Sequence, residues 1–194
     1  CRLILTTGWR RLRMQNGGCA QHTARKPCQI ERFEGAKFKY LAASTVRADG
    51  STLFPASGIR SFGKGRSAVQ VGIIGLTLKD TSNLVSPDGI KGLTFGDEAA
   101  AINAQVPRLR QAGADAVIVL IHQGGYTSGN PDPSSCANLT GEIKPILDQL
   151  DPGVDVVVSG HTHWSYVCDY GQINPAKPIL LTSAGVYGQL ITDI

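Results

Sequence analysis

Three of the four histidines in this chain stand directly after apolar runs of strand length. His122 follows the run at residues 115–121, and His161 and His163 follow the run at residues 154–159. Ligands in open α/β sheets bind at the carboxyl ends of strands, where loops from neighbouring strands converge. Neutral imidazole is a common protein ligand for zinc and similar divalent metals. These positions therefore predict a metal site at the carboxyl edge of a sheet.

The spacing of His161 and His163 strengthens this prediction. Residues two apart in an extended chain point the same way, so both imidazoles can face one site, and Gly160 allows the backbone to turn tightly. A lone histidine at a strand end is more often hydrogen-bonded without a ligand, but a His-x-His pair with a histidine from a second strand favours metal binding. His22 lies in a polar loop, and we interpret it as a solvent-exposed residue with no role.

Positioning these side chains requires a layered α/β domain. Apolar runs alternate with amphipathic segments from residue 69 onward, which is typical of this class. Strands are predicted over residues 69–76, 115–121, 154–159, 179–182 and 190–194. Helical spacing is seen in two stripes: Ala99, Ile102, Val106 and Leu109, and Ile143, Ile146, Leu147 and Leu150. The first stripe is stopped by Gly113 and should kink at Pro107.

Length and composition indicate one globular domain. The chain has 194 residues, of which 42% are hydrophobic, and this suffices for a sizeable core. No apolar run approaches the roughly 18 to 20 residues of a membrane span, and residues 1–7 are too short and too quickly basic for a signal peptide. Because the sequence begins with Cys1 and not Met, we expect its true start to be missing.

Charge is distributed unevenly. Residues 1–66 hold 13 Lys or Arg and 3 acidic residues, a net +10, whereas residues 67–194 hold 6 and 12, a net −6. A basic segment can bind nucleic acid. This one has little aromatic interleaving and no recognisable nucleic-acid module. We therefore do not expect nucleic acid as a partner, and interpret the basic surface as one that another part of the protein covers or balances.

The five cysteines favour disulfides over a metal or redox motif, because no Cys-x-x-Cys occurs and the spacings are irregular. Cys19 and Cys28 flank a polar loop, and Cys136 and Cys168 lie beside the expected site strands. Two bridges and an odd Cys1 would suit an oxidising compartment. Unpaired buried thiols are the alternative.

Other reactive groups have simpler explanations. Asp97 and Glu98 stand at a helix start, where acidic residues favour the helix dipole for structural reasons. The serines near Cys136 lack a Gly-x-Ser-x-Gly setting, which disfavours a serine hydrolase.

The order of motifs resembles the calcineurin-like metallophosphoesterases, in particular the 5'-nucleotidase and 2',3'-cyclic-nucleotide phosphodiesterase branch. The resemblance rests on His122-Gln123-Gly124-Gly125 after one buried strand and on Ser159-Gly160-His161-Thr162-His163 after another. It extends over residues 12–19, 38–43, 71–78, 93–95, 150–152 and 182–188.

This resemblance implies a four-layer αββα domain with two divalent metal ions at its strand ends, and it does not distinguish among Zn, Mn, Mg and Ca. By motif, His122 and His161 resemble ligands of one ion, and His163 resembles a ligand of the other. The implied reaction is hydrolysis of nucleotide phosphate esters by a metal-activated hydroxide, in a periplasmic or secreted protein.

The chain departs from the family pattern ahead of these histidines. The family has Asp-x-His, Gly-Asp and Gly-Asn-His motifs there, and none occurs in this sequence. Residues 1–12 read as a divergent or damaged start. We therefore expect residues 1–194 to be a catalytic domain truncated at its N-terminal side, with impaired activity, no catalytic residue present and no nucleotide-binding second domain.

Two other functions stay open at this point. His122, His161 and His163 could together hold one zinc ion with an open fourth position, as in mononuclear three-histidine enzymes. The basic N-terminal surface could instead belong to a non-catalytic binding protein.

Overall fold

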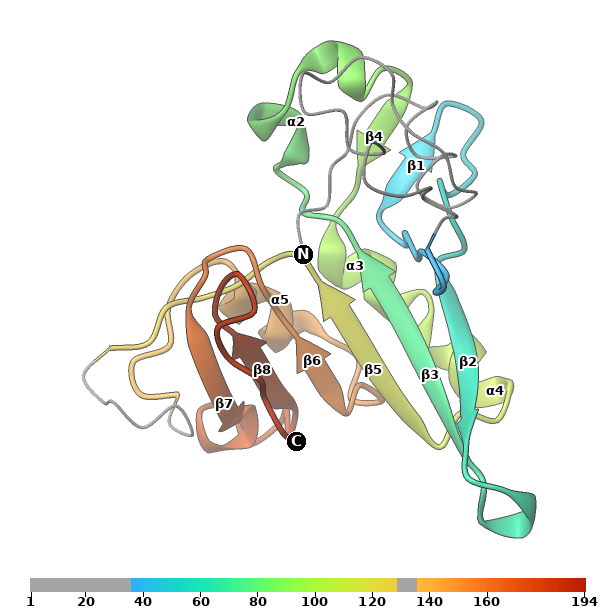
Figure 1. The fold of residues 1–194 in the computed structure, drawn as a ribbon, viewed down its shortest axis with the longest axis vertical. Coiled ribbons are helices and arrows are strands. Elements are labelled where there is room, and N and C mark those ends of the chain that lie inside the picture. The colour runs from blue at the N-terminus through green and yellow to red at the C-terminus, as the bar shows by residue number, and fades with distance from the viewer. Residues whose placement is uncertain (1–35, 129–135) are drawn as a thin grey trace, which may run out of the picture.

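A six-stranded sheet forms the centre of the computed structural model, which describes residues 36–128 and 136–194 (Figure 1). The strand order is β2-β3-β5-β6-β8-β7. These strands are β2 (Ser57–Phe62), β3 (Val69–Leu76), β5 (Ala116–Ile121), β6 (Val156–Val158), β7 (Ser165–Asp169) and β8 (Leu180–Ala184). The four inner strands run parallel, and β2 and β7 are antiparallel edges. A separate antiparallel pair joins β1 (Thr45–Arg47) to β4 (Leu93–Phe95).

The four parallel strands are those that the apolar runs predict. β3 has the predicted bounds, β5 begins one residue later, β6 is shorter and β8 ends later. The prediction of a strand at residues 190–194 is wrong. Leu190, Ile191 and Ile194 are exposed there, and no strand partner lies beside them among the described residues. Strand propensity alone does not form a strand where no neighbour supplies hydrogen bonds.

The helices also follow the sequence pattern, except that one predicted helical stripe forms two separate helices. They are α2 (Thr81–Leu84), α3 (Glu98–Asn103), α4 (Val106–Gln111) and α5 (Ile143–Gln149), with 3-10 turns η1 (Gly65–Ser67), η2 (Pro87–Gly89) and η3 (Tyr170–Gln172). The first predicted helical stripe forms two helices, α3 and α4. Pro107 lies in the first turn of α4, where its missing N–H is tolerated. Asp97 caps α3 by accepting a hydrogen bond from the Ala100 N–H at 3.0 Å, so its role is structural.

One face of the main sheet carries the core. Figure 1 shows α3, α4 and α5 on the same side of this sheet. Side chains alternate along each strand, and those on the helix side are fully buried. They include Ile74, Val117, Val119, Val157 and Leu181.

The opposite face is apolar, yet no helix among residues 36–128 and 136–194 covers it (Figure 1). Ile73, Ile118, Val156 and Val158 are only partly buried, and Leu120 is 43% exposed. Parallel sheets are normally covered on both faces, which is why their strands are continuous apolar runs. This face therefore has the chemistry of a layer interface within an α/β domain.

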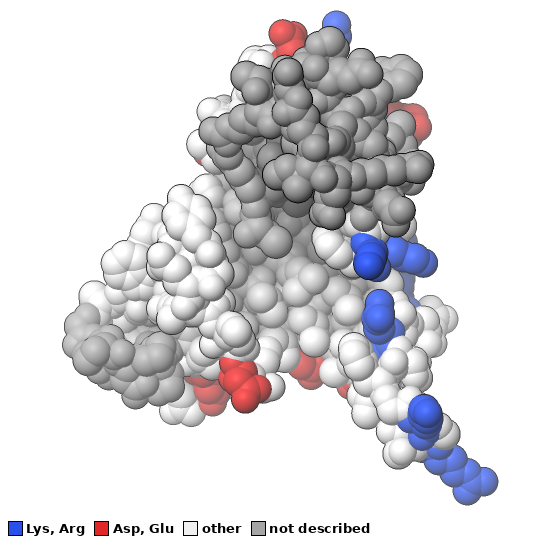
Figure 2. All heavy atoms as spheres, viewed as in Figure 1, with Lys and Arg blue, Asp and Glu red and all other residues white. Residues whose placement is uncertain are grey.

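Part of the basic excess of residues 1–66 lies on β2 and the turn that follows it. Arg60, Lys64 and Arg66 lie on this strand and the following turn, with no acidic residue between Gly50 and Lys79. Figure 2 shows Lys and Arg side chains along this side of the molecule down to the tip of the hairpin. No helix in the described residues is long and apolar enough to cross a membrane.

Asp148 on α5 joins that helix to the segment that follows β7. Its carboxylate accepts hydrogen bonds from the Tyr170 hydroxyl at 2.7 Å, the Asn174 amide at 2.8 Å and the Lys144 ammonium at 3.2 Å. Burial raises the pKa of this carboxyl, but the hydrogen bonds from Asn174, Tyr170 and Lys144 outweigh burial, so the pKa is below its ordinary value of 3.8. The charged form of Asp148 therefore stabilises the fold.

We expect Asp148→Asn to lower the free energy of unfolding by about 1 kcal/mol near neutral pH, a value reduced for the partial exposure of the site. Because the folded pKa is depressed, the contribution of Asp148 is present above pH 3.8 and is lost as pH falls through the folded pKa. Urea denaturation at a series of pH values measures this difference. The exposed Asp193→Asn is the control, and an equal effect of both substitutions would contradict the assignment.

Candidate active site

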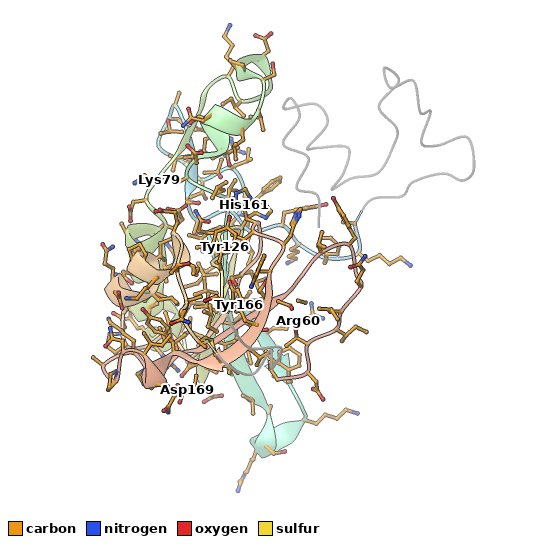
Figure 3. The ribbon with its side chains drawn as sticks, turned by 90° about the vertical axis from the view of Figure 1, so that its left-hand side faces the viewer. Arg60, Lys79, Tyr126, His161, Tyr166 and Asp169 are labelled. Carbon is orange, nitrogen blue, oxygen red and sulfur yellow. A yellow bond between two sulfur atoms is a disulfide. The ribbon has the colours of Figure 1, made fainter. Side chains whose placement is uncertain are left out.

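The candidate site lies at the carboxyl ends of β5 and β6, which are neighbours in the parallel ladder. His122 follows β5, and His161 follows β6 by two residues. Their imidazole rings are 5.1 Å apart between centroids and meet edge to face at 67°. Figure 3 shows His161 at the end of the sheet opposite Asp169. The structure thus brings together two histidines that lie 39 positions apart in the sequence.

His163 makes a different ring contact from this pair. Its ring packs against Tyr187, with 5.7 Å between ring centroids and an angle of 56°. Among the residues that the structure describes, no three His, Cys, Asp or Glu side chains converge closely enough to hold one metal ion. The described arrangement is therefore a histidine pair with a third histidine beside it.

The backbone that presents these histidines is strained, and the expectation of an extended His-x-His segment is wrong. His161 has φ 68° and His163 has φ 63°, both in the left-handed region that side chains other than glycine rarely adopt. The Thr162 N–H donates to the Gly160 carbonyl at 2.8 Å, which closes a three-residue turn around His161. This reversal explains why His161 and His163 contact different neighbours. Such strain gathers at functional sites.

Hydrogen bonds hold the two histidine loops against each other. The Gly160 N–H donates to the Gln123 carbonyl at 3.1 Å, and the Thr162 hydroxyl donates to the Gly125 carbonyl at 2.8 Å. The loop after β6 thereby supplies hydrogen-bond donors to backbone carbonyls of the loop after β5. The orientation of each histidine therefore depends on the position of both loops.

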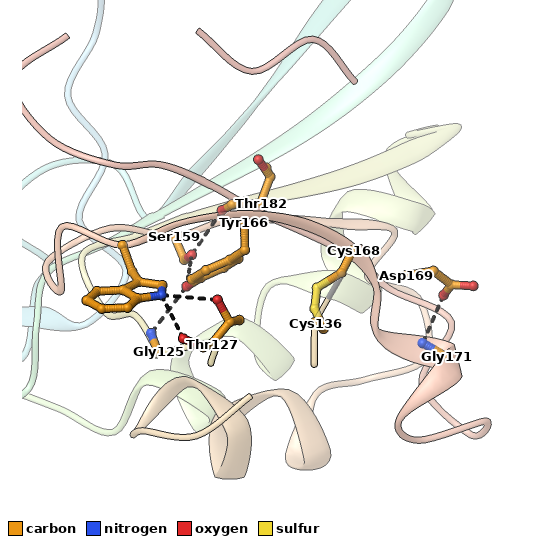
Figure 4. Close-up of a disulfide and its surroundings, with 10 residues drawn as sticks. Gly125, Thr127, Cys136, Ser159, Tyr166, Cys168, Asp169, Gly171 and Thr182 are labelled. Carbon is orange, nitrogen blue, oxygen red and sulfur yellow. Dashed lines mark hydrogen bonds between the residues drawn. A yellow bond between two sulfur atoms is a disulfide. The ribbon is translucent and has the colours of Figure 1, made fainter. Parts of the chain in front are cut away.

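The Tyr166 hydroxyl is the buried centre of this arrangement (Figure 4). It accepts from the Gly125 N–H at 3.2 Å and lies 2.7 Å from the Ser159 hydroxyl. Because Ser159 donates its own proton to the Thr182 carbonyl at 2.9 Å, Tyr166 donates to Ser159. Burial raises the pKa of the Tyr166 phenol, so it remains a donor at neutral pH. The sequence did not single out Tyr166, because nothing in its local pattern indicates this long-range role.

Two glycines allow the close approach of the loops. A Cβ atom on Gly124 would lie 2.1 Å from the Gly160 carbonyl oxygen and 2.7 Å from the Thr162 hydroxyl. A Cβ atom on Gly125 would lie 2.5 Å from the Thr140 carbonyl oxygen. At Gly160, in contrast, a Cβ atom would meet nothing within 4 Å, and its φ is not positive. Gly124, and not Gly160 as expected, is therefore the glycine that the His161 turn requires.

His122 is held neutral by its surroundings. Burial lowers its pKa, and the neighbouring His161 and His163 lower it further, because a second positive charge there is unfavourable. A neutral imidazole has a free lone pair, which is the form that binds a metal ion.

A small cavity of about 140 Å³ adjoins the pair. It is lined by Thr77, Leu78, Thr81, Leu84, Val85, His122 and His161. Its far wall follows β3, so loops after three neighbouring parallel strands meet there. Thr77 and Leu78 directly follow the predicted strand at residues 69–76, and this position could have indicated from the sequence that they line the site.

A disulfide ties the loop after β5 to β7. Cys136 and Cys168 are bonded, with 5.4 Å between their Cα atoms (Figure 4). Cys168 pairs with Leu181 near the amino end of β8, so it lies toward the end of the sheet opposite the histidines and not beside the site strand ends as expected. The other expected cysteine pair, Cys19 and Cys28, lies outside the described residues together with Cys1 and His22.

We expect Gly124→Ala to destabilise the protein by about 1 to 3 kcal/mol, because the new methyl group overlaps the turn that presents His161. Gly160→Ala should cost less than about 1 kcal/mol, since its Cβ meets open space. Urea denaturation followed by circular dichroism measures both. The reverse order of the two effects would show that the loops do not pack as described.

We expect a non-reduced proteolytic digest to contain a linked peptide pair joining Cys136 and Cys168. Reduction before digestion should separate the two peptides, as mass spectrometry can verify. Cys136→Ser should destabilise the oxidised protein by about 2 to 4 kcal/mol, because the bridge restrains the unfolded chain. Free thiols at both positions in protein made under oxidising conditions would remove the argument for an oxidising compartment.

Comparison with known proteins gives relatives among nucleotide-processing and cell-wall proteins. The chain is 29% identical over 181 residues to the endonuclease YhcR of Bacillus subtilis, covering 93% of this chain and 13% of the relative. It is 34% identical to the cell wall protein Lmo0130 of Listeria monocytogenes, covering 69% and 18%. A 5'-nucleotidase of Vibrio cholerae is 30% identical, covering 73% and 25%. The chain thus spans a quarter or less of the length of these three relatives.

Among solved structures, the fold matches YfkN, a calcineurin-like phosphoesterase from Bacillus subtilis. The TM-score is 0.59 at 20% sequence identity, over 77% of this chain and 48% of that one. At this identity the likeness shows the fold alone.

The family model of the calcineurin-like phosphoesterases matches residues 29–165. This span includes the sheet from β2 to β6 and all three candidate histidines. The chain therefore belongs to the calcineurin-like phosphoesterase family.

Proposed function

We propose that this chain supplies metal ligands to a two-metal phosphoesterase centre, with His122 and His161 on one ion and His163 on the other. The observation that carries this proposal is the contact between His122 and His161 at adjoining strand ends, with His163 turned toward Tyr187. A pair with a separate third histidine suits two neighbouring ions better than one.

The residues fit a divalent metal ion. Imidazole nitrogen is a suitable donor for zinc, manganese and related ions, and the depressed pKa of His122 keeps its lone pair available. The cavity beside the pair offers space for a ligand, and the strained turn at His161 orients that ring toward His122. Bound divalent ions would supply charge stabilisation to a phosphate ester and lower the pKa of attacking water.

This chain's own contribution is binding and orientation. Within the part of the chain that the structure describes, no carboxylate joins the histidines to offset the charge of an ion. We therefore propose that the complete centre needs acidic ligands from outside the described residues. The Tyr166 hydrogen bond and the missing side chain of Gly124 allow the two histidine loops to lie close together.

We propose nucleotide phosphate esters as the substrates. The named activities of two relatives, an endonuclease and a 5'-nucleotidase, both concern phosphate esters of nucleotides. The chain covers only 13% and 25% of those proteins, so the specificity of the whole protein is part of the proposal.

We also propose that residues 1–194 form part of one catalytic domain, whose remaining layer packs on the open sheet face. The exposed Leu120 and the partly buried Ile118 and Val158 on that face support this arrangement. A separate nucleotide-binding domain would lie elsewhere in the whole protein.

Export to the periplasm or the exterior is proposed from two observations. The Cys136–Cys168 disulfide suits an oxidising compartment. One relative is named a cell wall protein.

The single-zinc alternative has less support, because His163 contacts Tyr187 and not the histidine pair. The binding-protein alternative depends on the basic segment, most of which lies outside the described residues.

The proposal predicts how metal binding responds to substitution. In calorimetric titrations with Zn²⁺, His122→Ala and His161→Ala should each weaken one binding event by about tenfold or more, corresponding to about 1.4 kcal/mol. The double variant should lose little more than either single variant, because both side chains serve one ion. His163→Ala should leave that event unchanged. Without acidic ligands, affinity should be modest in all cases.

His22→Ala is the control and should bind like the parent. An equal loss of Zn²⁺ affinity in all three variants would instead indicate a single ion bound by all three histidines. Unchanged Zn²⁺ affinity in all three variants would overturn the assignment. The same variants are tested for phosphate release from AMP with Mn²⁺. Because no carboxylate joins the histidines within residues 36–128 and 136–194, the parent should release phosphate no faster than His161→Ala.

A further inference from the structure

The hairpin formed by β2 and β3 projects beyond the rest of the main sheet. β2 and β3 pair as far as Phe62 and Val69, whereas β5 pairs with β3 only from Val71 onward. Residues 61–70 therefore extend past the sheet as a two-stranded ribbon, which Figure 1 shows at the opposite end of the molecule from β4. We call residues 60–71 the hairpin tip. It lies at the amino ends of the parallel strands, whereas the histidines follow their carboxyl ends.

Glycines and local hydrogen bonds shape the turn of the hairpin tip. Gly63 has φ 87° and Gly65 has φ 61°, in the left-handed region that glycine adopts without steric cost. The Ala68 N–H donates to the Gly65 carbonyl at 3.3 Å, and the Ser67 hydroxyl donates to the Lys64 carbonyl at 3.1 Å. The side chains of the turn therefore extend from a backbone of defined shape.

Three cationic side chains extend from the hairpin tip. Arg60, Lys64 and Arg66 are all exposed, and the ion pairs formed within residues 36–128 and 136–194 lie elsewhere. One acidic side chain, Asp115, meets the base of the ribbon, where its carboxylate accepts the Gln70 N–H at 2.7 Å. Figure 2 shows Lys and Arg side chains along the projecting hairpin. The hairpin tip therefore carries positive charge that no described acidic group pairs with.

Apolar side chains are exposed on one face of the same hairpin tip. Phe62 lies directly opposite Val69, and Arg60 lies directly opposite Val71. Because directly opposite and alternate residues share a face, all four side chains lie on one side of the ribbon. Phe62 is 53% exposed and Val69 is 45% exposed. This face therefore combines positive charge with an apolar surface.

Protection of a sheet edge explains only part of this pattern. Basic residues on an edge strand hinder its pairing with another chain, and this reason suffices for Arg60 on β2. Lys64 and Arg66 lie in the turn beyond the strand, where no edge needs protection. An exposed Phe62 would promote association between chains and not hinder it. The combination of cations and apolar groups therefore indicates a partner that is both anionic and apolar.

We propose that the hairpin tip docks this protein on the surface of an anionic phospholipid bilayer. The lipid phosphates attract the cations, and the acyl boundary below them accepts Phe62 and Val69. A nucleic acid would offer phosphates to the cations but no apolar phase to Val69. Docking at this end leaves the histidines, at the opposite end of the sheet, open to dissolved ligands. With three cations and a small apolar surface, binding should be weak and reversible.

Co-sedimentation of the whole chain with lipid vesicles tests this docking. One set of vesicles contains phosphatidylcholine alone, and the other contains phosphatidylcholine mixed with phosphatidylglycerol. The protein should bind the mixed vesicles and bind the neutral ones far less. At an ionic strength of about 1 M, where the Debye length is about 3 Å, most of the binding should be lost. Equal binding to both kinds of vesicle, or binding to neither, would overturn the proposal.

Substitutions then locate the docking surface. Arg66→Gln should weaken binding to the mixed vesicles about fivefold, and Arg66→Lys should keep it near the parent value. Lys91→Gln is the matched control, because it removes the same charge from an exposed residue just before β4, at the far end of the molecule (Figure 1). An equal loss in Lys91→Gln would indicate attraction by net charge alone and refute the assignment, as would unchanged binding in Arg66→Gln.

The apolar contribution has its own test. Phe62→Ser should weaken binding to the mixed vesicles about fivefold without changing its dependence on salt, because it removes no charge. Short duplex DNA at the same phosphate concentration should leave most of the parent protein on the vesicles. Complete release by DNA would show a site for any polyanion and would reject the bilayer as the partner. No metal ion is added in these experiments, so their outcome is independent of the proposed metal centre.

Discussion

The Tyr166 hydroxyl is the contact on which the candidate site depends. Tyr166 is fully buried on edge strand β7, and its hydroxyl links Gly125 after β5 to Ser159 at the end of β6. A buried hydroxyl with both partners satisfied is stabilising, whereas the same groups left unpaired would each be costly. Tyr166 therefore adds a buried link between the His122 and His161 loops to the direct hydrogen bonds that join them. Gly124 then permits the loops to approach until the Gly160 carbonyl lies over its backbone.

This arrangement explains why the strain at His161 and His163 can persist. Left-handed backbone at residues other than glycine is unfavourable by about 1 to 3 kcal/mol each, so other contacts must fix it. The Thr162 hydroxyl bonded to Gly125 and the Ser183 hydroxyl bonded to the Trp164 carbonyl supply such contacts on either side of His163. The Cys136–Cys168 bridge adds a covalent restraint to the loop that carries Tyr126.

The two faces of the sheet have different roles. The helix face holds the core of the described residues, with Ile74, Val117 and Leu181 fully buried. The other face carries the same kinds of side chain on the alternate positions but is only partly covered. Because both faces of a parallel sheet are apolar, each inner strand is a continuous apolar run, and these runs make the strands easy to recognise. Because both faces are apolar, the sequence pattern does not show which face packs against the helices and which against another layer.

The sequence by itself determined the inner strands, the helical stripes and the position of three histidines at strand ends, because apolar periodicity is a local property. It also indicated the break near Pro107 and the helix start at Asp97, which follow from the backbone chemistry and charge of single residues. It did not reveal β2 and β7, since polar residues interrupt both strands and neither is a continuous apolar run. It wrongly favoured a strand at residues 190–194, which have no strand partner among the described residues. Only the tertiary structure decided that His161 faces His122 while His163 faces Tyr187, and that Gly124 is the glycine the turn requires. Those outcomes depend on contacts between loops that are distant in sequence, and on left-handed backbone that no local residue preference favours.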